Sequence, residues 1–93
     1  MPVLEWHEAA RADLLAIVEY ISDDNPAAAQ QLKDDIEKKV GLLPKRPKLH
    51  RPGRVVGTRE MIVRANYLVV YAESDDVISI LRILHAARQW PPT

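Results

Sequence analysis

The stretch RILHAARQWPP, residues 82–92, brings together three side chains suited to chemistry on a phosphodiester. The planar forks of Arg82 and Arg88 match a phosphate group bidentately. His85 can exchange a proton near neutral pH. Cleaving RNA needs a base for the 2′-hydroxyl proton, cations around the scissile phosphate and an acid for the leaving oxygen. These three residues are therefore predicted as a catalytic group.

Further cations precede this stretch in the sequence. Arg59 and Arg64 fall on a predicted strand and are candidate phosphate ligands. A loop over residues 45–54 contributes the rest of the predicted substrate-binding set: Lys45, Arg46, Lys48, Arg51 and Arg54. If the fold gathers these side chains on one sheet face, they form a surface for a polyanion.

The net charge of zero hides an uneven distribution of charge along the chain. Residues 1–40 carry four basic and nine acidic side chains, for a net charge of −5, and residues 41–93 carry nine basic and four acidic ones, for +5. This asymmetry indicates a polyanionic partner for the basic half. The alternative is that the two halves neutralise each other within the fold.

Other kinds of chemistry leave no signature in the sequence. There is no cysteine, which excludes disulfides and thiolate catalysis and fits a cytoplasmic protein. The three histidines lack metal-ligand spacing, and no nucleotide-binding motif is present, so we expect neither a metal nor another cofactor. No apolar run has the length of a membrane span, and the N-terminus does not resemble a signal peptide, so we expect no membrane partner.

Hydrophobic periodicity predicts a single α+β domain over residues 1–93. A short strand at residues 3–6 precedes a helix that ends near Ser22, and Asn25 and Pro26 start a second helix as N-cap and first residue. Strands at 55–64, 67–73 and 77–85 follow with short connections, which indicates antiparallel pairing. The expected fold is a β-α-α-β-β-β chain in which an antiparallel helical hairpin packs on one face of a small, mainly antiparallel four-stranded sheet.

Simple alternation along the last strand puts Ile78, Ile80, Arg82 and Leu84 on one side, and Leu81, Ile83 and His85 on the other. An arginine in a central strand needs a carboxylate partner or an open concavity, and Glu60 is the candidate partner. Ordinary roles compete with the functional ones: Arg82 as half of a structural ion pair, His85 and Trp90 as packing residues, and the 45–54 loop as a solvated segment.

Three stretches resemble the RelE/ParE superfamily of toxins from type II toxin–antitoxin modules, in its RelE/StbE-like and ParE-like branches. They are ADLLAIVEYISDDNPAAA, GTREMIV and YLVVYAESDDVISILRILHAARQWP, and the resemblance covers nearly the whole chain. It implies the same helical hairpin on a small sheet and a cognate antitoxin, in a hetero-oligomeric complex.

The resemblance implies two mechanisms. RelE-like members cleave mRNA on the ribosome, which would make His85 the proton-transfer group, with Arg82, Arg88, Arg59 and Arg64 around the phosphate and the 45–54 loop along the RNA backbone. ParE-like members inhibit DNA gyrase and need no nuclease site. Cleavage of mRNA is the first hypothesis, gyrase inhibition the second, and a non-toxic nucleic-acid-binding module the third.

Overall fold

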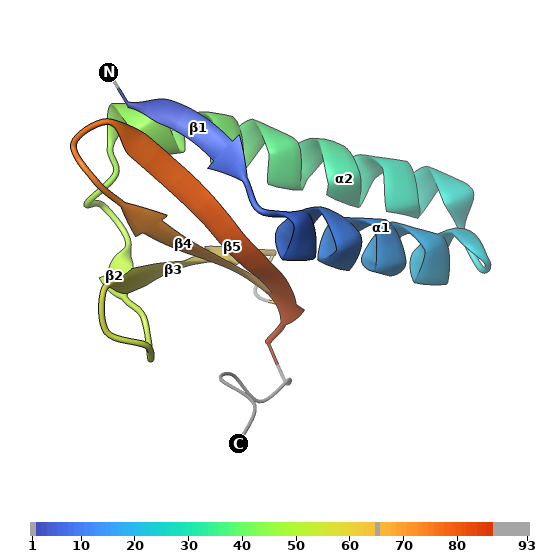
Figure 1. The fold of residues 1–93 in the computed structure, drawn as a ribbon. Helices are drawn as coiled ribbons and strands as arrows, with labels where there is room; N and C mark the ends of the chain where they lie inside the picture. Colours follow the sequence, from blue (N-terminus) through green and yellow to red (C-terminus); the bar gives the residue numbers. More distant parts are fainter. Residues whose placement is uncertain (1, 65, 87–93) are drawn as a thin grey trace.

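A computed structural model describes residues 2–64 and 66–86 (Figure 1). The elements follow one another along the chain as β1 (Val3–Trp6), α1 (Glu8–Ser22), α2 (Pro26–Gly41), the 3₁₀ turn η1 (Leu43–Lys45), β2 (Arg51–Pro52), β3 (Thr58–Val63), β4 (Tyr67–Glu73) and β5 (Val77–His85). In the described part of the chain, no helix combines the length and the apolar composition needed to span a membrane.

The two helices form the expected hairpin, and local sequence explains where α2 starts. The Asn25 side chain accepts a hydrogen bond from the Ala28 N–H at 3.1 Å, and Pro26 occupies the first turn. One stripe of α2, Ala29, Leu32, Ile36 and Val40, is buried, and α1 buries Ala10 and Leu14 against it. Both helices lie on the same side of the sheet (Figure 1).

The sheet has five strands in the order β1-β5-β4-β3-β2, where four were predicted. β1 runs parallel to β5, and the other pairs are antiparallel. The additional strand, β2, lies inside the predicted loop and pairs over only two residues, Arg51 with Glu60 and Pro52 with Arg59. Such a short pairing has no alternating pattern of its own, so periodicity did not predict it.

β3 begins three residues later than predicted because the chain first makes a tight turn. The Gly53 N–H donates to the Thr58 carbonyl at 2.7 Å, and Gly57 adopts a positive φ of 86°. A side chain at Gly53 would collide with the Thr58 hydroxyl, since a Cβ there would lie 2.2 Å from it. This turn folds β2 back onto β3.

A bulge in β5 corrects the predicted facing of its side chains. Val70 pairs with Arg82 but Tyr71 pairs with Ile80, so Leu81 is the extra residue. Ile78 and Ile80 therefore share the helix-side core with Ile83 rather than with Arg82 or Leu84. The inserted residue shifts the alternation by one, which simple counting along the strand cannot detect.

Candidate functional site

Arg82 is held by an aspartate of α1. Its Nε donates to Asp13 Oδ2 at 2.6 Å, and Nη2 donates to Oδ1 at 3.0 Å. The same Oδ2 accepts the backbone N–H of Ile83 at 3.0 Å, just past the point where β1 stops pairing with β5. The hydrogen bond to Asp13 raises the pKa of Arg82. The fork is thus bound in the bidentate manner that a phosphate would require.

The predicted partner, Glu60, binds other cations. Glu60 is 3 % exposed, and its carboxylate lies 3.2 Å from Arg51 Nη2 and 3.7 Å from Arg54 Nε. It also accepts the backbone N–H of Arg54 at 3.0 Å. The expectation that Glu60 neutralises Arg82 is therefore wrong, because the turn at residues 53–58 brings two nearer arginines over this carboxylate.

Arg59 fastens the 45–54 loop to the sheet. Its Nε donates to Glu73 Oε1 on β4 at 3.0 Å, and its Nη1 donates to the His50 carbonyl at 2.7 Å. The buried Tyr71 adds a second tie, since its hydroxyl donates to the Pro47 carbonyl at 2.8 Å. Burial raises the pKa of Tyr71, which keeps this hydroxyl a donor. The loop is thus bound to the sheet rather than merely solvated.

Arg64 follows the other end of β3, five residues from Arg59 along the chain and about 17 Å away at the usual rise per strand residue. Its Nε donates to Asp35 Oδ2 on α2 at 2.7 Å, in a pair that is largely exposed. The structure therefore separates Arg59 from Arg64. It gathers Arg51, Arg54 and Arg59 at the β2 end of the sheet instead.

His85 is exposed at the end of β5. Its ring meets that of Tyr67 edge to face, with ring centroids 5.4 Å apart. The next residue, Ala86, donates its N–H to the Asn66 carbonyl at 2.6 Å. Arg88 and Trp90 lie outside the described residues. The proximity of Tyr67 to His85 was not predicted, although the first residue of β4 and the last residue of β5 face each other in an antiparallel pair.

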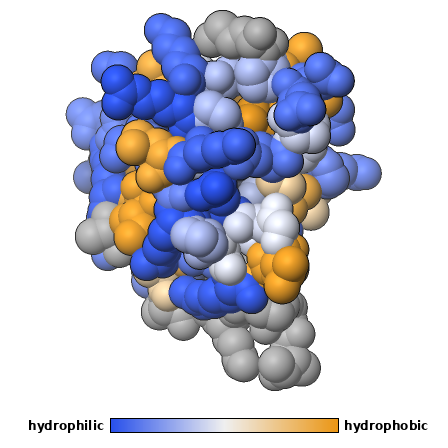
Figure 2. All heavy atoms as spheres, turned by 90° about the vertical axis from the view of Figure 1, so that its left-hand side faces the viewer, coloured by the Kyte–Doolittle hydropathy of each residue, from blue (hydrophilic) through white to orange (hydrophobic). Residues whose placement is uncertain are grey.

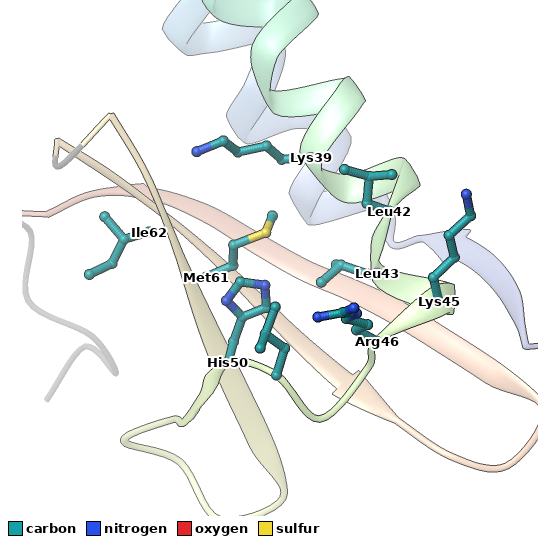
Figure 3. A pocket seen from close by; sticks show the side chains of 9 residues that line it. Lys39, Leu42, Leu43, Lys45, Arg46, His50, Met61 and Ile62 are labelled. Atoms are coloured by element: carbon teal, nitrogen blue, oxygen red, sulfur yellow. The ribbon is translucent and has the colours of Figure 1, made fainter.

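The remaining predicted cations, Lys45, Arg46 and Lys48, are exposed. Lys45 and Arg46 border a hollow of about 320 Å³, which we call the α2–β3 groove. The groove is lined by Lys39, Leu42, Leu43, Lys45, Arg46, Leu49, His50, Met61 and Ile62 (Figure 3). Figure 2 looks at this end of the molecule and shows apolar patches set among hydrophilic surface.

The groove combines an apolar floor with a basic rim. Leu43 and Met61 are buried beneath it, whereas Leu42 and Leu49 are 53 % and 64 % exposed. Burial lowers the pKa of His50, and the nearby charges of Lys39 and Arg59 lower it further. Sequence reasoning missed this groove, because its residues come from a helix end, a loop and a strand. Within the described residues, no cluster of His, Cys, Asp or Glu side chains could hold a metal ion.

Comparison with known proteins assigns this chain to a family. The family model for the ParE toxin of the type II toxin–antitoxin system parDE matches residues 4–90. The chain belongs to the ParE toxin family. It is therefore a type II toxin–antitoxin toxin of the RelE/ParE superfamily, as the three sequence stretches predicted.

Relatives of this ParE-family toxin support the assignment over most of the chain. Protein Y4kP of Sinorhizobium fredii is 37% identical, covering 95% of this chain and 92% of its own length. Toxin RelE2 of Caulobacter vibrioides is 34% identical, covering 95% and 99%. A chain of the chromosomal ParDE TA system from P. aeruginosa matches with a TM-score of 0.84 at 28% identity, covering 91% and 96%. This similarity confirms the predicted α+β fold.

Proposed function

We propose that this toxin arrests growth by binding DNA gyrase and inhibiting it, without cleaving RNA. The observation that carries the proposal is the state of Arg82. Asp13 already accepts hydrogen bonds from the Nε and Nη2 of Arg82, and it also accepts the backbone N–H of Ile83. For Arg82 to bind a phosphate in the same way, it would have to leave the partly buried carboxylate of Asp13 without its counter-charge, which is costly.

The other strand arginines support the same proposal. Arg59 is bound to Glu73, and Arg64 to Asp35 on a different element. Phosphate stabilisation needs preorganised donors directed at one point. These two arginines instead serve to attach the 45–54 loop and α2 to the sheet. The resemblance to the ParE-like branch supplies gyrase as the target.

The partner of this toxin is a cognate antitoxin that neutralises it in a hetero-oligomeric complex. The family model describes toxins of the parDE system, and a solved relative comes from a ParDE system. A neutralising antitoxin acts by covering a surface that the toxin needs or by holding it in an inactive complex.

Ribosome-dependent mRNA cleavage is the second candidate, favoured by the exposed His85 beside Tyr67. In this mechanism His85 exchanges protons with the 2′-hydroxyl or the leaving 5′-oxygen. Arg82 and Arg88 stabilise the phosphate, Arg59 and Arg64 hold the substrate, and the 45–54 loop follows the RNA backbone. The ribosome supplies the positioning that so sparse a site lacks. One relative carries the name Toxin RelE2.

Two reactions run side by side test the proposal. Purified toxin is added to gyrase with relaxed plasmid, and separately to a translation reaction with a defined mRNA mapped by primer extension. We expect loss of supercoiling and intact mRNA, and we expect prior addition of antitoxin to restore supercoiling. Unchanged supercoiling, together with ribosome-dependent cuts in the mRNA, would replace the proposal with the second candidate.

A further inference from the structure

The α2–β3 groove has the composition of a protein-docking site. Leu42 and Leu49 expose more than half of their surface beside a hollow with a largely apolar floor. Apolar side chains exposed together beside a cavity are typical of sites that receive anchor side chains from a partner. Figure 3 shows Lys45 directed away from the hollow, Lys39 extended from α2 along its edge toward the side of Ile62, and Met61 and His50 at its centre.

The rim of the groove carries positive charge that no carboxylate offsets. Lys39, Lys45 and Arg46 line it, and no acidic residue does so in the described part of the chain. A second hollow, between β1 and the helical hairpin, provides the contrast. There Lys33 is paired with Glu37 at 2.9 Å, and both side chains line the hollow. With Arg11, the second hollow carries a net charge of +1, whereas the α2–β3 groove carries +3 and has no carboxylate among its lining residues.

From this combination we infer that the α2–β3 groove binds a segment of the cognate antitoxin in which large apolar side chains are flanked by Asp or Glu. The apolar side chains would cover Leu42 and Leu49, and the carboxylates would face Lys39, Lys45 and Arg46. Complementary charge of this kind speeds association and fixes the register of the bound segment. The inference rests on the antitoxin partner of the proposed function, but not on whether the toxin acts on gyrase or on mRNA.

The floor of the groove argues against a nucleic acid as its occupant. Proteins that bind single strands stack bases on aromatic rings along a basic track. Here the exposed side chains beside the cations are leucines and Ile62, and the one ring among the lining residues, His50, is partly buried edge to face against Tyr71. Aliphatic side chains of a peptide fit them better.

The test measures binding of the purified antitoxin, identified as the neighbouring gene product that rescues growth, to toxin variants by calorimetry. Leu42→Glu/Leu49→Glu places two acidic groups in the groove at exposed positions, so the fold is retained. We expect the Kd to rise at least about tenfold. Lys45→Glu/Arg46→Glu, which alters only the rim, should also weaken binding and flatten its salt dependence.

Two matched controls introduce the same acidic group at exposed apolar positions elsewhere. Leu15, 59 % exposed, lines the second hollow, and Val56, 99 % exposed, lies in the turn before β3. Leu15→Glu and Val56→Glu should change the Kd less than about threefold. Circular dichroism and thermal melts verify that each variant is folded.

Three results would overturn the inference. The first is an unchanged antitoxin Kd in both groove variants. The second is unchanged antitoxin binding with loss of growth arrest, which would assign the groove to the toxin's target. The third is unchanged antitoxin binding with disruption of a toxin dimer, measured by light scattering, which would assign it to a second copy of the chain. A failed supercoiling assay would leave the binding result intact, so the two proposals fail separately.

Discussion

Two sets of cations in this toxin differ in what surrounds them. The strand arginines Arg59, Arg64 and Arg82 each have a carboxylate partner from another element. Lys39, Lys45 and Arg46 surround the α2–β3 groove with no carboxylate among its lining residues. The first set holds elements together, and the second leaves charge available to a partner.

This difference explains how the acidic and basic halves of the sequence relate to each other. Asp13 and Asp35 of the acidic half bind Arg82 and Arg64 of the basic half. These two ion pairs offset two of the five excess charges on each half of the chain. The charge that remains near the end of α2 and in the following loop is the part that can select an acidic partner.

The largest effect on stability is expected from breaking the Arg82 pair. Asp13→Asn removes the counter-charge of Arg82 and leaves one side-chain oxygen to accept from Arg82 and from the Ile83 N–H. We expect a loss of about 2 kcal/mol in the free energy of unfolding, measured by urea denaturation. The exposed pair supplies the control: Asp35→Asn should cost less than about 1 kcal/mol.

A double variant sharpens this prediction. When Asp13→Leu and Arg82→Met are combined, no charge is left without a partner, so the double variant should be more stable than Asp13→Leu alone. If the single and double variants were equally unstable, Arg82 would contribute nothing through its pair. The contrast with the groove cations would then be lost.

A smaller effect is expected from Glu60. Its buried carboxylate accepts from Arg51 and from the Arg54 backbone, so Glu60→Gln removes the charge but keeps one acceptor. We expect a loss of about 1 kcal/mol in unfolding free energy. Hydrogen exchange at residues 51–58 provides the local measurement. Unchanged protection there would mean that Glu60 does not hold β2 against β3.

The rim cations should behave in the opposite way. Because Lys45 and Arg46 are exposed and form no ion pair among the described residues, Lys45→Glu/Arg46→Glu should change the unfolding free energy by less than about 0.5 kcal/mol. The same urea titration measures this. A loss as large as that of Asp13→Asn would place these cations with the structural arginines.

The smallest effect concerns pH. The pKa of His50 lies below its ordinary value of 6.5 in the folded protein, so the unfolded chain takes up the proton first as pH falls. Above the pKa of His50 in the unfolded chain, His50 has no effect on the unfolding free energy. As pH falls from there through the pKa of His50 in the folded protein, its protonation lowers the unfolding free energy. The unfolding free energy of His50→Gln, followed from pH 7 to 5, should fall less steeply than that of the parent protein. Parallel curves would contradict this.

Local sequence predicted the helices, the antiparallel pairing of β3, β4 and β5 and most strand bounds, because caps and periodicity are local signals. It did not predict β2, whose two residues pair only through the turn at Gly53 and Gly57. It also misplaced Arg82, because the bulge at Leu81 shifts the alternation and because Asp13, 69 residues away in sequence, becomes its partner. Partnerships of this kind depend on tertiary contacts, which periodicity does not encode.

The most direct test of whether the residues around His85 are catalytic is to measure growth arrest in cells that express the His85→Ala variant. His85 is exposed, so the substitution should leave the fold intact, as a thermal melt will verify. If the toxin acts by binding, cells that express His85→Ala without antitoxin will still stop growing. A folded His85→Ala protein that no longer arrests growth, while the parent protein cuts mRNA on the ribosome, would contradict that mechanism.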